Sequence, residues 1–131
     1  MDYQRNAFII RRGSSSSTDR NEELATAAFE RRLIVYLDEW SNRRTLEARV
    51  YGATQGERPV LIGFQLDAGY GVAPEQIWKV IDDLDRVLVQ QETYEFCERT
   101  LPAQYTSQVL KFHAVSPDTD LDMSKHEEAG D

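Results

Sequence analysis

The chain has 131 residues, a formal net charge of −8, and 40% hydrophobic and 10% aromatic residues. This composition excludes a wholly disordered or fibrous chain and is enough for one domain with its own core. No apolar run approaches the roughly 20 residues of a membrane-spanning helix, so we expect no membrane association. The one cysteine, Cys97, cannot form an internal disulfide, which favours an intracellular protein, cytoplasmic or nuclear.

Positive and negative charges are distributed unevenly along the sequence. Residues 1–60 contain ten Lys/Arg and nine Asp/Glu, whereas residues 61–131 contain five and fourteen. Twelve of the fifteen basic residues are arginine, whose planar guanidinium binds phosphate and stacks on rings. A biased genomic base composition would produce the same arginine excess. We expect the folded protein to have one cationic side and one acidic side.

The N-terminal region predicts a strand, a loop and a helix. The apolar run Ala7–Ile10 is typical of a short strand. The serines that follow predict a flexible loop over residues 13–19. Asp19 and Glu22 have the spacing of a capping box, which predicts a helix from Arg20 to about Glu30.

Three strand-like segments come next and indicate an antiparallel sheet. Arg31–Trp40 fits either a helix or a strand, and its β-branched and aromatic residues favour a strand. Arg44–Gly52 and Arg58–Leu66 both alternate between apolar and other residues, which predicts strands with one covered face. Gly63 leaves room for a close approach to the third strand.

A long amphipathic helix is predicted to begin at Pro74, because apolar residues recur at helical spacing as far as Leu88. Tyr105–Val115 alternates again and favours a further strand over a helix. From Ser116 the chain is acidic and poor in apolar residues, which predicts a disordered tail over 116–131.

These elements predict an α+β fold in a single domain over residues 1–115. Its antiparallel sheet is a three-stranded meander, which flanking strands could extend, and one long amphipathic helix packs against it.

The order of strands and helix between Arg31 and Gln90 resembles the single-stranded-DNA-binding domain of the positive cofactor four family of transcriptional coactivators. The resemblance rests on short motifs: Arg44-Thr45-Leu46, Arg49-Val50-Tyr51, Gly63 with Leu66, Pro74-Glu75-Gln76 with Trp78, and Asp82-Asp83-Leu84-Asp85. Such a fold holds a nucleic-acid strand across a sheet face in pairs of subunits. The resemblance therefore implies a homodimer formed through the helices, for which we select Trp78, Ile81 and Leu88.

The leading functional hypothesis is a single-stranded nucleic-acid-binding protein that acts in transcription or replication. Single-strand binders combine a cationic track with aromatic side chains on which bases stack. The candidates for phosphate contact are Arg43, Arg44, Arg49 and Arg58. The candidates for base stacking are Trp40 and Tyr51.

The alternative is a small acidic protein-interaction module, such as an adaptor, immunity or inhibitor protein. Its acidic helix and tail would bind a basic partner. We expect no enzymatic activity, because Cys97 and His113 have no evident orienting third group. We also expect no metal or cofactor, since the Asp118-x-Asp120-x-Asp122 pattern lacks the glycine and glutamate of a calcium loop.

Overall fold

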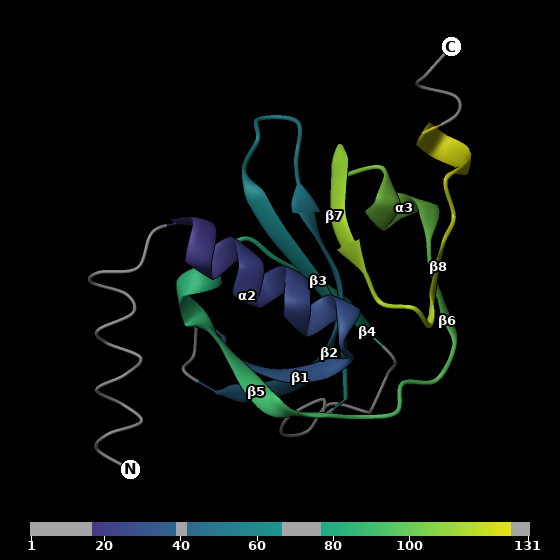
Figure 1. Ribbon diagram of the computed structural model, residues 1–131. Coiled ribbons are helices and arrows are strands. Elements are labelled where there is room, and N and C mark those ends of the chain that lie inside the picture. Colours follow the sequence, from purple (N-terminus) through teal and green to yellow (C-terminus); the bar gives the residue numbers. More distant parts are fainter. Residues whose placement is uncertain (1–16, 39–41, 67–76, 127–131) are drawn as a thin grey trace.

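The computed structural model describes residues 17–38, 42–66 and 77–126 (Figure 1). The predicted strand at Ala7–Ile10 and the start of the predicted helix at Pro74 lie outside these ranges. The elements in chain order are α2 (Ser17–Phe29), β1 (Arg32–Leu37), β2 (Arg43–Ala53), β3 (Pro59–Gln65), β4 (Ile77–Ile81), the 3-10 helix η1 (Leu84–Arg86), β5 (Val87–Thr93), β6 (Arg99–Leu101), α3 (Ala103–Thr106), β7 (Lys111–Val115) and β8 (Thr119–Leu121).

Helix α2 forms where the capping-box pattern predicts a helix, although it begins at Ser17 and so includes part of the predicted loop. Leu24, Ala27 and Ala28 recur at helical spacing on one side and are fully buried. The helix ends just before Arg31, which has a φ of 60°. A residue in this left-handed conformation commonly terminates a helix, and here it turns the chain into β1.

The main sheet has the strand order β4-β3-β2-β1-β5, and β7 also pairs with β2. All of these pairs are antiparallel. β2 pairs with β1 through residues 43–47 and with β7 through residues 50–53. The register against β3 shifts between Ala48 and Val50, so Arg49 is the extra residue of a β-bulge. β2 therefore changes its partner at Arg49.

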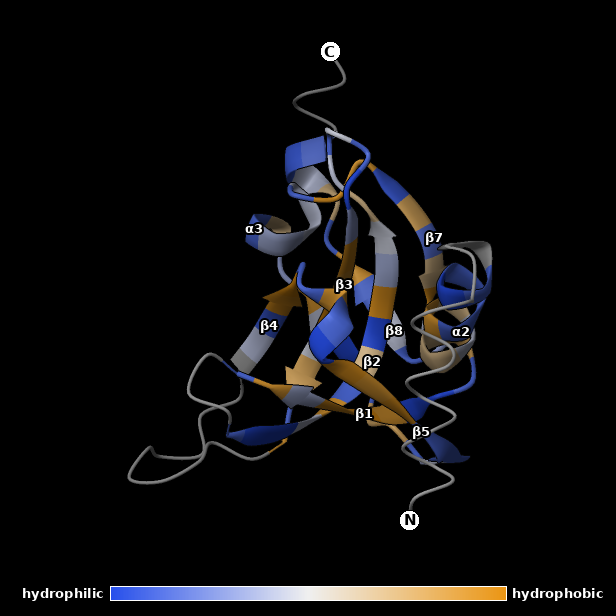
Figure 2. Ribbon diagram, turned by 90° about the vertical axis from the view of Figure 1, so that its left-hand side faces the viewer, coloured by the Kyte–Doolittle hydropathy of each residue, from blue (hydrophilic) through white to orange (hydrophobic). Residues whose placement is uncertain are grey.

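Both faces of the central strands are covered. Helix α2 packs on one face in a core that includes Leu24, Ile34, Leu46, Leu61 and Ile81. The opposite face carries a second core, formed by Val50, Val60, Ile62, Leu101 and Val109. Figure 1 shows α2 and the β6–α3–β8 region on opposite sides of β2 and β3. In Figure 2 the hydrophobic residues lie mainly on strands such as β1, β3 and β5.

The α+β class and the antiparallel sheet are confirmed, but the long helix from Pro74 is wrong in its described part. Residues 77–81 form β4 and residues 87–93 form β5. The acidic residues Asp82, Asp83 and Asp85 therefore lie in the connection between two strands, not on a helix. Strand β4 forms because it supplies backbone hydrogen bonds to the free edge of β3.

The prediction of a disordered tail from Ser116 is wrong as far as His126. The strand predicted over Tyr105–Val115 forms only in its second half, as β7. Strand β8 follows and pairs in parallel with β6. Ser116 and Thr119 are 1% and 7% exposed, respectively. The Asp122 amide also donates to the Leu101 carbonyl at 3.1 Å. The domain consequently extends beyond the predicted boundary at residue 115.

Candidate functional site

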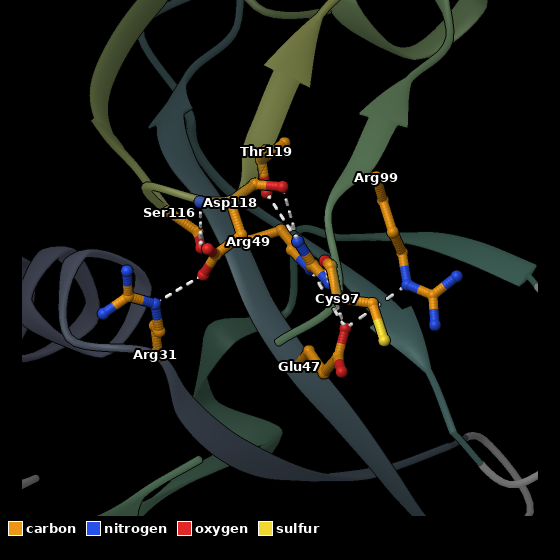
Figure 3. A network of polar contacts seen from close by, with 8 residues as sticks. All are labelled: Arg31, Glu47, Arg49, Cys97, Arg99, Ser116, Asp118 and Thr119. Carbon is orange, nitrogen blue, oxygen red and sulfur yellow. Dashed lines mark hydrogen bonds and ion pairs between the residues drawn. The ribbon is translucent and has the colours of Figure 1, made fainter. Parts of the chain in front are cut away.

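The structure places Arg49 in the interior, where its side chain is 0% exposed. Nη2 donates to Glu47 Oε1 at 2.6 Å and to the Cys97 carbonyl at 2.7 Å. Nη1 donates to Thr119 Oγ1 at 3.1 Å and to the Asp118 carbonyl at 3.2 Å. Figure 3 shows this guanidinium between residues of β2, the β5–β6 connection and the β7–β8 turn, with Arg31 to one side.

The bulge explains why simple alternation misplaces this residue. Alternation predicts that Arg49 and Tyr51 share an exposed face of the sheet, but the extra residue at Arg49 breaks the alternation. Tyr51 is 2% exposed and belongs to the core beneath α2, where its hydroxyl donates to Asn21 Oδ1. The prediction of an accessible binding face is therefore wrong for Arg49 and Tyr51.

The other predicted phosphate ligands do not form a common track. Arg43 is exposed, whereas Arg44 is paired with Asp38 at 3.1 Å. Arg58 has a 75% exposed side chain that lies 4.0 Å from Asp82. These arginines flank opposite ends of β2, roughly 30 Å apart at the usual rise per residue. Trp40 lies outside the described residues.

The three predicted interface residues have different environments. Ile81 is 1% exposed in the core beneath α2, so it cannot contact a second subunit. Trp78 is half-buried and packs edge-on against Phe64, with ring centroids 5.2 Å apart. Leu88 is 44% exposed and points away from the core. The homodimer stays a prediction.

Most described arginines are engaged within the chain. Arg20 binds Glu23 and two backbone carbonyls, and Arg86 binds the carbonyls of Leu37 and Asp38. Arg99 stacks 3.6 Å from the centroid of the Phe64 ring. Ion pairs or hydrogen bonds to side chains also hold Arg31, Arg32, Arg44 and Arg49.

Many carboxylates, by contrast, are exposed and have no partner among residues 17–38, 42–66 and 77–126. These side chains make no ion pair or side-chain hydrogen bond within those ranges. They are Glu57, Asp83, Asp85, Glu95, Glu98 and Asp120. The charge left available at the described surface is therefore mainly negative. This is the opposite of the cationic sheet face that the sequence predicts.

An open hollow of about 1070 Å³ lies beside the Arg49 network. Its lining comes from the end of α2, the segment after β5 and the turn before β8, and consists of Phe29, Glu30, Arg31, Thr93, Tyr94, Glu95, Phe96, Cys97, Pro117 and Asp118. Phe29 and Tyr94 are 64% and 44% exposed, and Cys97 is also exposed. Sequence reasoning missed this site because no motif links its three distant segments.

The lining of the hollow is acidic overall. Among the described residues that line it, Arg31 is the only cation, and Arg31 Nε donates to Asp118. Glu30 is paired with Arg32 at 2.7 Å, while Glu95 has no partner among the residues that the structure describes. A ligand in the hollow would therefore meet aromatic rings and carboxylates.

Among the residues that the structure describes, two tyrosines and one aspartate have shifted pKa values. Burial raises the pKa of Tyr51, and the nearby charge of Arg20 opposes this shift. Burial, followed by the negative charge of Asp83, raises the pKa of Tyr36. Hydrogen bonds from Ser124 lower the pKa of Asp122. None of these groups lines the hollow.

The described residues contain no cluster of histidine, cysteine and carboxylate side chains that could hold a metal ion. None of their helices is long and apolar enough to cross a membrane. Comparison with protein families, curated proteins and solved structures finds no match to this chain. Its function must therefore be argued from its own residues.

Proposed function

We propose that the protein is a small acidic protein-interaction module that binds a basic region of a partner protein. The observation that supports this proposal is the contrast between engaged arginines and unpaired carboxylates. A guanidinium already bound to a carboxylate or carbonyl has few donors left for phosphate. An exposed carboxylate without a partner keeps its full attraction for lysine and arginine.

The acidic residues that support the proposal differ from those expected from the sequence. Asp82, Asp83 and Asp85 lie on the β4–β5 connection, and Asp120 lies on β8. All four are exposed and held on or between strands. A fixed acidic surface loses less entropy on binding than a disordered tail would.

Single-stranded nucleic-acid binding is the competing hypothesis, and the resemblance to the positive cofactor four family remains a prediction. The structure leaves Arg43 and Arg58 as its exposed candidates among the arginines selected from the sequence. Phosphate contacts supply most non-specific affinity for nucleic acids. We therefore expect weak or no binding to a nucleic-acid strand.

The test compares two fluorescent probes by anisotropy, a single-stranded oligonucleotide and a peptide of alternating arginine and glycine. We expect the peptide to bind at about 100 mM salt and to dissociate as salt screens the charges. We expect the oligonucleotide to show no binding under the same conditions. Substitution of both Asp83→Lys and Asp85→Lys should weaken peptide binding, whereas Arg43→Gln should leave it unchanged.

Two results would overturn the proposal. One is a peptide that fails to bind even at low salt. The other is an oligonucleotide that binds more tightly than the peptide and loses affinity when Arg43 and Arg58 are replaced by glutamine. That second result would support the nucleic-acid hypothesis.

A further inference from the structure

We infer that the hollow between α2, the β5–β6 connection and the β7–β8 turn is the docking site for a lysine or arginine side chain of the partner. This inference rests on the proposed function and assigns it to one place on the surface. The occupant is a basic segment of another protein.

The first argument comes from the two exposed aromatic residues. Phe29 and Tyr94 are 64% and 44% exposed although both line a hollow of about 1070 Å³. Apolar rings gain free energy when water is removed from them, so two exposed rings in one concavity indicate a contact surface. Their faces also attract a cation by its interaction with the ring electrons.

The second argument comes from charge. The lining that the structure describes contains the carboxylates of Glu30, Glu95 and Asp118 and one cation, Arg31. The Arg31 guanidinium is bound to Asp118 and is thus partly neutralised. A negatively charged ligand would be repelled by Glu95, which has no partner within the described ranges. An ammonium or guanidinium group would find both a ring and a carboxylate.

The third argument comes from the rigidity of the hollow. The Tyr94 amide donates to the Arg31 carbonyl at 2.9 Å, which ties the segment after β5 to the start of β1. Phe96, which also lines the hollow, is 7% exposed, and its ring centroid lies 4.8 Å from Arg49 Cζ. The Arg49 hydrogen bonds fix both Cys97 and Asp118. A preformed site loses little conformational entropy on binding.

Cys97 offers a direct measurement of occupancy. It lines the hollow, it is exposed, and it is the only cysteine of the chain. Alkylation by iodoacetamide therefore reports on one position. At constant ionic strength, a saturating amount of the arginine-glycine peptide should slow the alkylation of Cys97 severalfold. A peptide of alternating glutamate and glycine, used at the same concentration, should not slow it.

Variants separate the hollow from the rest of the acidic surface. Replacement of Phe29 or Tyr94 by alanine should lower the affinity for the peptide about twofold to fivefold, the usual range for a lost cation–aromatic contact at an exposed site. Leu110→Ala is the matched control, because Leu110 is 55% exposed and does not line the hollow. Glu95→Gln should likewise weaken binding more than Glu98→Gln.

The outcomes distinguish the site from the function. If the wild-type protein does not bind the peptide, the proposed function fails. If it binds the peptide but Cys97 is not protected, or if all variants bind alike, the function stands and the assignment to the hollow is wrong. Protection of Cys97 by an oligonucleotide would also overturn the assignment.

Discussion

At the scale of single residues, Arg49 shows how a charged group can act as part of the core. Its guanidinium joins β2 to the β5–β6 connection and to the β7–β8 turn through Glu47, Cys97, Asp118 and Thr119. A buried ion pair adds little stability by itself, because desolvation opposes the attraction. Loss of one partner is costly, because the other charge is then buried alone.

We therefore expect Arg49→Met to lower the free energy of unfolding by about 3–5 kcal/mol. Glu47 is only 6% exposed, and in this variant Arg99 Nε would be its remaining cation at 3.6 Å. Combining Arg49→Met with Glu47→Gln should restore part of the loss. Urea denaturation measures these differences, and Arg43→Met on the exposed start of β2 is the control. Equal midpoints for Arg49→Met and Arg43→Met would show that the network has no structural role.

Tyr51 gives a prediction for alkaline pH. Its pKa is raised above 10.0 chiefly by burial, so the folded state favours the neutral phenol. The resulting stabilisation is complete below the unfolded pKa and is lost as the pH rises through the folded pKa. Tyr36 acts in the same direction. The protein should therefore lose stability above about pH 10.

Tyr51→Phe tests this explanation. The variant loses the hydrogen bond to Asn21 and should be less stable near neutral pH by about 1 kcal/mol. Its stability should then fall less steeply than that of the wild type between about pH 9 and 11. Urea midpoints at several pH values measure both effects. If the urea midpoints of the two proteins fall in parallel as the pH rises, groups other than Tyr51 cause the loss of stability at alkaline pH.

At the scale of elements, the sequence predicts the strands that alternate and misses those that do not. β2 and β3 alternate clearly and are joined by a tight turn, so both are predicted within a few residues. Ile77, Val80, Ile81 and Leu84 have helical spacing, but most of them are β-branched and fit short strands equally well. Residues 77–81 form a strand because they pair with the edge of β3, and no local sequence pattern predicts this pairing.

The candidate site could not be predicted for a related reason. The sequence of β2 predicts a regular alternation through Arg49 and Tyr51, but a bulge at Arg49, where β2 changes its partner from β1 to β7, breaks that alternation. The hollow depends on contacts between residues 29–31, 93–97 and 117–118. These contacts appear only once the tertiary structure is known. The acidic charge of the second half was predictable from composition alone.

Strand β8, which forms where the sequence predicts a disordered tail, can be tested directly by mutation. Leu121 packs against the second core, whereas its neighbour Asp120 is exposed. Leu121→Ala should lower the free energy of unfolding by about 1–2 kcal/mol, less than a fully buried leucine because Leu121 is only half-buried. Asp120→Ala should have little effect. Equal effects of the two substitutions on the denaturation midpoint would be expected of a disordered tail and would contradict the structure.

At the scale of the whole molecule, the arrangement of charge follows from the fold. Arginines on α2, β1 and β2 form ion pairs with carboxylates close to them in the sequence, and three of them also donate to carbonyls of distant segments that the fold brings beside them. The acids of the β4–β5 connection lie in sequence next to one another and mostly lack such partners. Within residues 17–38, 42–66 and 77–126, the excess of negative charge is thus carried mainly by exposed carboxylates that repel each other.

This arrangement predicts that salt stabilises the protein. Exposed charges are screened over about 10 Å at 0.1 M salt, whereas buried pairs such as Arg49–Glu47 are screened much less. The urea midpoint should therefore rise as NaCl increases from about 20 mM to 500 mM. Replacing Asp83 and Asp85 together by asparagine should raise the midpoint at low salt and flatten its dependence on salt, because repulsion has already been removed. Arg43→Gln should lower the midpoint at low salt and steepen its dependence on salt. A midpoint that falls with salt in the wild type would mean that exposed ion pairs, rather than unpaired acids, dominate the surface, and the expected attraction for a basic partner would lose its basis.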